Sequence, residues 1–271
     1  MKPRPKFRRL CATLLVAASV FVAATSAHPL GNFSVNQFAG IQAGLTRVRV
    51  HYVVDMAEIA AFQELRGVRQ DANRAYLTSD LNAYLERIAP QYAAGLKLLA
   101  DDAPIALQLT SKTIQVEPGA VGLPTLRLTF DFVSSALPRA ETHRFQFENT
   151  NLSERSGWRE LMLTPISGTE IYDSAIPGSS LSNELKNYPE QAAQAPLNER
   201  AGAWTATRGA LPANAKRLTT RDGQAVRPVP SSWADALQER FGAPWLLGLA
   251  LLMLGGLLWL WRARQLRTAH A

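Results

Sequence analysis

One alternating stretch decides the fold, the segment 47-RVRVHYVVD-55. Its every second side chain is apolar, so that one face carries Val48, Val50, Tyr52 and Val54. A period of two with one apolar face is typical of a half-buried β-strand, and a strand is therefore predicted within 33–54. His51 shares the opposite face with arginines, and we expect it to be a solvated strand histidine.

Short strand-like segments return further along the chain and are separated by turns. They cover 96–99, 105–109, 113–116, 126–133, 143–147 and 158–163. Residues 71–90 instead show helical spacing of apolar side chains, and Pro90 is expected to end that helix. Together these patterns favour a mainly β fold, an antiparallel immunoglobulin-like β-sandwich with an inserted amphipathic helix.

Both ends of the chain carry membrane-targeting patterns. Residues 1–27 combine a basic start, an apolar run and small residues, as a secretory signal peptide does, so the mature chain is expected to begin at His28. Residues 241–261 contain no charge and are long enough for one C-terminal transmembrane helix, and the arginines that follow favour a cytoplasmic tail at 262–271. We predict a single-pass protein of the inner (cytoplasmic) membrane, with an extracytoplasmic, periplasmic domain at 28–188 and a Pro/Ala-rich stalk at 189–240.

The charge distribution argues against a nucleic-acid partner. The chain carries a formal charge of +7. Eight of its 29 Lys and Arg residues lie in 1–27 and 262–271, which leaves 21 against 22 acids in the rest. The positive charge is therefore explained by membrane topology, and no basic patch suited to phosphates is expected. The one cysteine, Cys11, lies in the predicted signal peptide, so a thiolate metal site is not expected either.

Three residues are candidate metal ligands. A terminal His28 would offer its α-amine and its imidazole to one ion, and both are close to neutral near pH 7. Asp55 and Glu58 lie three residues apart where the predicted strand gives way to a short helix, so that their carboxylates could also ligate a cation. Each has a simpler interpretation: His28 as a frayed terminus, and Asp55 as a helix cap, which the spacing alone favours.

Catalytic motifs are absent from the sequence. It contains no GxSxG, P-loop, GxGxxG, HExxH or CxxC, and we predict that the protein is not an enzyme. One enzyme class stays open as an alternative, a copper enzyme built on a terminal histidine. It would need His51 or His143 to converge on His28.

Three segments resemble the extracytoplasmic N-terminal domain of bacterial nickel/cobalt transporter-like proteins, which are related to the HupE/UreJ group. They are 28-HPLGNFSVN-36, 54-VDMAEI-59 followed by 62-FQE-64, and 156-SGWRE-160. The resemblance implies a metal-associated domain with His28, Asp55 and Glu58 as metal ligands. Members of this family often have proline where this chain has Ala60, which implies a less rigid turn here.

The multi-helix permease part of such proteins has no counterpart in this sequence. The resemblance therefore implies an accessory module that binds or presents nickel or cobalt to a separately encoded polytopic permease. Nitrogen and carboxylate ligands would equally suit copper or zinc, so ligand chemistry alone does not select the divalent metal. The alternative is a metal-independent structural or interaction subunit of a membrane complex.

Overall fold

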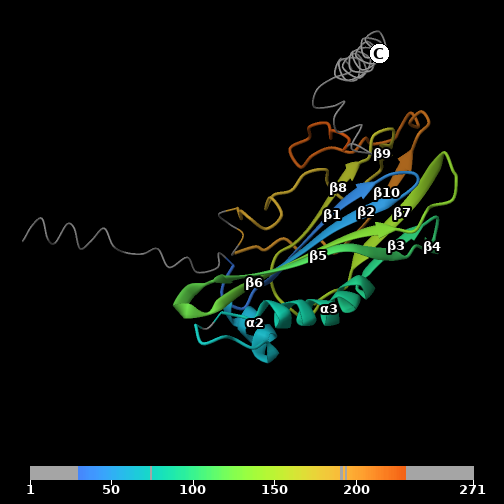
Figure 1. Ribbon diagram of the computed structural model, residues 1–271. Helices are drawn as coiled ribbons and strands as arrows, with labels where there is room; N and C mark the ends of the chain where they lie inside the picture. Colours follow the sequence, from blue (N-terminus) through green and yellow to red (C-terminus); the bar gives the residue numbers. More distant parts are fainter. Residues whose placement is uncertain (1–29, 74, 190–191, 193, 230–271) are drawn as a thin grey trace, which may run out of the picture.

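The computed structural model describes residues 30–229, except 74, 190, 191 and 193. In this part of the chain two five-stranded sheets pack together, and the α-helices α2 and α3 lie beside them (Figure 1). The expectation of a mainly β fold is confirmed. The predicted signal peptide, transmembrane helix and cytoplasmic tail fall outside the described residues, and so does His28. Between residues 30 and 229, no helix is both long and apolar enough to cross a membrane.

The first sheet has the strand order β5-β6-β2-β1-β8. Its strands are β1 (Val35–Ala43), β2 (Val48–Met56), β5 (Leu107–Pro118), β6 (Pro124–Ser134) and β8 (Arg159–Pro165). The stretch 33–54, for which one strand was the expectation, forms the hairpin of β1 and β2. The segments 105–109 and 113–116 are likewise not two strands, because β5 runs through both with a register shift between Leu109 and Ser111.

The second sheet has the order β4-β3-β7-β10-β9. It contains β3 (Leu96–Ala100), β4 (Ala103–Pro104), β7 (Thr142–Asn149), β9 (Glu170–Tyr172) and β10 (Ala201–Thr207). β10 lies within 189–240, the expected stalk, and these residues are part of the second sheet. They pair with β7 on one side and β9 on the other, because this sheet supplies partners for their backbone groups.

One strand pair also departs from the antiparallel prediction. β8 runs parallel to β1, with Phe38 beside Glu160 and Gly40 beside Met162. A parallel neighbour needs a long connection rather than a hairpin, and the whole second sheet except β9 and β10 is threaded between these two strands.

The core lies between the sheets and follows the alternation of β2. Val48, Val50, Tyr52 and Val54 are at most 1 % exposed, and they form one apolar cluster with side chains of the neighbouring strand β6 and of β7 and β10 in the second sheet. Burial of such side chains contributes roughly 1.5–3 kcal/mol each. The register of β2 is therefore fixed strongly, because a shift of one residue would turn these four side chains to the outer face.

The two helices cover an edge of this core. α2 spans Glu58–Glu64 and α3 spans Thr78–Ala94, with short 3-10 turns at Leu65–Gly67 and Ala120–Gly122. α3 buries Tyr92 against Phe130 of β6, with ring centroids 5.0 Å apart. The inserted amphipathic helix is thus present.

The bounds of α3 differ from the predicted 71–90 at both ends. The Asp71 carboxylate accepts hydrogen bonds from the backbone N–H groups of Asn73 and Ala75, and this local turn competes with helix formation before Thr78. At the other end the helix continues past Pro90 to Ala94. Proline removes one backbone hydrogen bond there, and burial of apolar side chains on both sides of it offsets the loss.

Candidate functional site

The N-terminal segment is hydrogen-bonded to the turn that joins β2 to α2. The carbonyl oxygen of Ser34 accepts the N–H of Ala57 at 3.0 Å, and that of Asn32 accepts the N–H of Ile59 at 2.8 Å. Leu30 packs against a second apolar cluster on the outer face of the first sheet, the outer-face cluster, made of Phe38, Val53, Trp158, Leu185 and Ala192. We call this meeting of residues 30–34 with 55–59 the β2–α2 corner.

Asp55 lies at the end of β2 with its carboxylate on the outer face. The Tyr188 hydroxyl donates to Asp55 Oδ2 at 3.4 Å. Burial raises the pKa of the Tyr188 phenol, and the Asp55 carboxylate raises it further, so this hydroxyl keeps its proton at neutral pH. The N-cap of α2 is Ala57, with no side-chain cap hydrogen bond.

Glu58 is buried, with 1 % of its surface exposed. One carboxylate oxygen accepts the backbone N–H of Ala120 at 3.1 Å, and the other, Oε2, is buried without a hydrogen-bond partner. Gly119 permits this approach, because a Cβ there would meet Glu58 Cγ at 2.7 Å. A buried carboxylate oxygen without a donor costs free energy, and a bound cation would offset that cost.

The described residues do not bring the predicted ligands together into one site. The carboxylates of Asp55 and Glu58 engage different partners, Tyr188 and Ala120. Within residues 30–229 as described, no group of three or more His, Cys, Asp or Glu side chains is arranged to hold a metal ion. His28, the third predicted ligand, lies outside the described residues.

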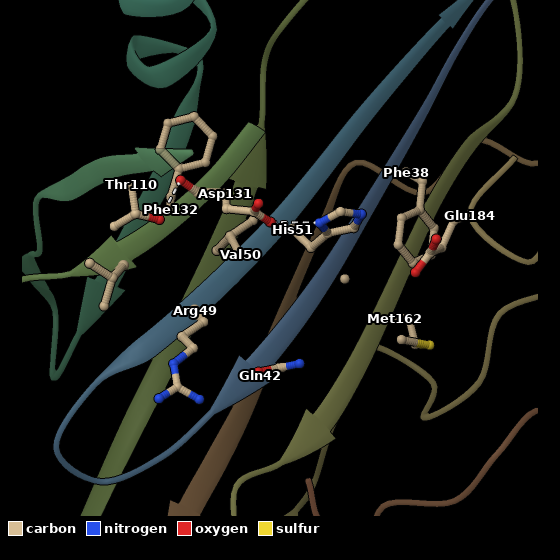
Figure 2. Close-up of a pocket in the computed structure, with 12 residues that line it drawn as sticks. Phe38, Gln42, Arg49, Val50, His51, Thr110, Asp131, Phe132, Met162 and Glu184 are labelled. Atoms are coloured by element: carbon tan, nitrogen blue, oxygen red, sulfur yellow. Dashed lines mark hydrogen bonds and ion pairs between the residues drawn. The ribbon is translucent and has the colours of Figure 1, made fainter. Parts of the chain in front are cut away.

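A second polar site lies on the outer face and was missed by sequence reasoning. It is a groove of about 560 Å³, the outer groove. Its polar lining, drawn in Figure 2, is Gln42, Arg49, His51, Thr110, Asp131 and Glu184. His51 Nδ1 lies 2.7 Å from Asp131 Oδ1. His51 is half-exposed as expected, but its partner is eighty residues away in sequence, and only the β2–β6 register brings the two together.

His143 has a different environment. It is 1 % exposed, with Nδ1 at 2.6 Å from Asp101 Oδ2 and Nε2 at 3.0 Å from the carbonyl oxygen of Pro138. The backbone N–H of Arg144 and the His143 ring lower the pKa of the Asp101 carboxyl. Both ring nitrogens therefore face acceptors, and neither is open to a metal ion.

The motif 156-SGWRE-160 has a structural role. The buried Glu160 carboxylate accepts hydrogen bonds from Trp158 Nε1 at 2.9 Å, from the Ser182 hydroxyl at 2.5 Å and from the backbone N–H groups of Leu181 and Ser182. These bonds hold residues 181–188 over the outer face, so that Leu185 and Tyr188 cover Phe38 and Trp158.

Comparison with known proteins adds no assignment to this geometry: no protein-family model and no curated protein matches the sequence. The resemblance described above therefore stays a prediction from three short segments.

Proposed function

We propose that this chain is an accessory module that binds a divalent transition metal, nickel or cobalt by resemblance, and presents it to a separate membrane permease. In this proposal an immunoglobulin-like sandwich faces the periplasm, residues 241–261 anchor it in the inner membrane, and it catalyses no reaction. The metal would be held by His28 together with Asp55 and Glu58.

The observation that carries the proposal is the pair of hydrogen bonds at the β2–α2 corner. Ser34 and Asn32 accept the N–H groups of Ala57 and Ile59, which flank Glu58. Residues 32–34, which follow the expected start of the mature chain, are therefore held beside the turn that contains Glu58. In the proposal, His28 would reach Asp55 and Glu58 from this segment.

The buried Glu58 Oε2 supports the same proposal. It is the kind of atom that a cation would pair with, since it has neither solvent nor a donor. The site needs a deprotonated α-amine, a neutral imidazole and carboxylates, so metal retention is expected to fall as the pH drops below about 6.5.

Native mass spectrometry of the detergent-extracted full-length protein tests the proposal. We expect a mass that begins at His28 and one retained nickel or cobalt ion. His28→Ala and Glu58→Gln should each abolish that retention, whereas His270→Ala, the same kind of change near the other end of the chain, should not. Nickel and cobalt retention that is unchanged in His28→Ala would refute the site.

A specific observation favours the alternative, a metal-independent interaction subunit. A groove of about 710 Å³ lies between the helices and the β5–β6 hairpin, and Phe62 and Val121 at its edge are 46 % and 93 % exposed. Large exposed apolar side chains are common where proteins associate. Co-purification of a polytopic protein that is lost in Phe62→Ser, but is indifferent to chelators and to His28→Ala, would select this alternative.

A further inference from the structure

We propose that β5 is a self-association edge, along which two copies of this chain pair antiparallel about Ile114 and join their first sheets into one continuous sheet. The strand forms one border of the first sheet (Figure 1). This goes beyond the proposed function, because it uses neither the metal ligands nor a permease and concerns how two copies of the chain assemble.

The other three borders of the two sheets are short or covered. At β8, the carbonyl oxygens of Pro177 and Leu197 accept N–H groups of the strand, and at β9 residues 216–218 are hydrogen-bonded along the strand. β4 has only two residues, the second of which is a proline. β5, by contrast, has 12 residues, and no other segment of the described chain pairs with its second side. Proteins seldom leave so long an edge unpaired, because it is a template for pairing with another chain.

One hydrogen bond at the end of the β5–β6 hairpin shows which backbone groups of β5 face the open side. The Gly119 N–H donates to the Leu123 carbonyl oxygen at 2.7 Å, and this pair continues the register of the two strands. Hydrogen-bonded and non-bonded pairs alternate along an antiparallel ladder, so the odd-numbered residues of 111–117 bond to β6. The even-numbered residues direct their N–H and C=O groups to the open side, and they are Lys112, Ile114 and Val116.

These outward groups lack partners. In the part of the chain that the structure describes, no hydrogen bond reaches the open-side N–H and C=O groups of Lys112, Ile114 or Val116. Donors and acceptors in a row at strand spacing are complementary to the backbone of another extended chain. A second copy of this chain offers the same row of groups, so that each copy covers the edge of the other.

The charge in the middle of this edge is already neutralised. Lys112 shares the inner face of the sheet with Ile114 and Val116, and its Nζ lies 2.7 Å from a carboxylate oxygen of Glu86 in α3. A lysine on an edge strand usually discourages pairing. Here its charge is paired within the same chain, so it does not repel an approaching strand.

The register with the two-fold axis at Ile114 fits the sequence best. It lines up residues 111–117 of both copies, a stretch that lies beyond the register shift near the start of β5. Lys112 then lies beside Val116 of the partner subunit, and no like charges face each other. An axis at Lys112 would instead bring two lysines face to face, which destabilises a strand pair.

Two exposed side chains on the outer face make this register testable. Thr113 and Gln115 are exposed, and in the proposed pair Thr113 lies directly opposite Gln115 of the partner subunit. Because the backbone groups of both residues bond to β6, they form non-bonded pairs across the new interface, with Cα atoms about 4.5 Å apart. Substitutions at these two positions therefore change the interface and leave the β5–β6 hydrogen bonds in place.

Sedimentation of the full-length protein in detergent measures the association. We expect the wild type to form a dimer that dissociates on dilution. Thr113→Lys/Gln115→Lys places like charges opposite each other and should raise the dissociation constant of the dimer more than about tenfold. Thr113→Lys/Gln115→Glu is the matched control, because it changes the same positions but places opposite charges together, and it should remain a dimer.

Cysteine cross-linking gives an independent readout of the register, in a protein that also carries Cys11→Ser. Oxidation of a mixture of Thr113→Cys and Gln115→Cys proteins should give a disulfide-linked dimer, since the two positions are within disulfide range. Either protein alone should give far less, because identical positions then lie diagonally, about 8 Å apart.

A wild-type protein that stays monomeric at every concentration would overturn the proposal. So would a dimer that is unaffected by Thr113→Lys/Gln115→Lys and gives no cross-link in the cysteine mixture. None of these substitutions changes His28, Asp55 or Glu58, so nickel and cobalt retention reports separately on the proposed function.

Discussion

Glu160→Gln tests the idea that one buried carboxylate holds residues 181–188 on the outer face. Glu160 is 1 % exposed and accepts four hydrogen bonds, from Trp158, from the backbone N–H of Leu181 and twice from Ser182. Glutamine has nearly the same shape, but one of its terminal atoms is a donor. In either orientation of the amide, at least one of the four donors faces an NH₂ group and loses its acceptor.

The expected loss of stability follows from that count. A buried donor left unsatisfied costs about 1–3 kcal/mol, and bonds to a neutral acceptor are weaker than those to a carboxylate by roughly 1 kcal/mol each. Glutamine carries no charge to be buried, and this offsets part of the lost free energy. We therefore expect Glu160→Gln to lower the free energy of unfolding by about 2–4 kcal/mol, a large share of the 5–15 kcal/mol typical of a domain.

Urea unfolding of the full-length protein in detergent, followed by tryptophan fluorescence, measures this difference. Glu148→Gln is the control, because Glu148 is half-exposed and its nearest cation, Lys97, is 3.6 Å away, so that its loss should cost under about 0.5 kcal/mol. A Glu160→Gln protein as stable as this control would refute the reasoning, since the four bonds would then contribute nothing net.

Two further changes probe local conformation and charge. Val121 is 93 % exposed with φ 56°, a left-handed conformation that is costly for a β-branched residue. We expect Val121→Gly to raise the free energy of unfolding by about 0.5–1 kcal/mol, because relief of this conformation exceeds the entropy that glycine adds to the unfolded chain. A lower melting temperature would contradict this. The hydrogen bonds from Arg69 lower the pKa of Asp80 to about 2, below its unfolded value of about 3.9. The contribution of this pair to the free energy of unfolding is therefore present above pH 4 and lost between about pH 4 and 2. If the urea midpoint of Asp80→Asn had the same acid dependence as that of the wild type, the pair would be unimportant for stability.

The sequence predicts the strands that have one polar face. β2 and β6 alternate because their inner side chains meet the second sheet while the outer ones meet solvent or polar groups. β1 does not alternate, because both of its faces are covered: Ile41 contacts the core and Phe38 the outer-face cluster. The boundary between β1 and β2 was therefore not visible in the alternation of apolar and polar side chains.

β10 could not be predicted for a different reason. Its residues 201-AGAWTAT-207 are mostly small, follow a segment rich in proline and alanine, and become a strand because β7 and β9 offer partners on both sides. Local composition indicates a linker there, whereas the long-range pairing decides the structure.

The candidate sites divide in the same way. Asp55 and Glu58 were proposed from their spacing, since they lie three positions apart where β2 ends. The outer groove depends on the contact between His51 and Asp131 across β2 and β6, two residues that lie eighty positions apart in sequence and leave no local signal.

The late position of β8 and β10 along the chain has a consequence for how the protein is made. β1 lacks its parallel neighbour until β8 has been synthesised, and β7 lacks one neighbour until β10 follows. At 5–20 residues per second, β10 appears roughly 10 to 30 s after β1. During that interval the hydrophobic edges of both sheets are open, so the nascent chain should stay unfolded and depend on chaperones, and should fold only once nearly all of the sandwich is available.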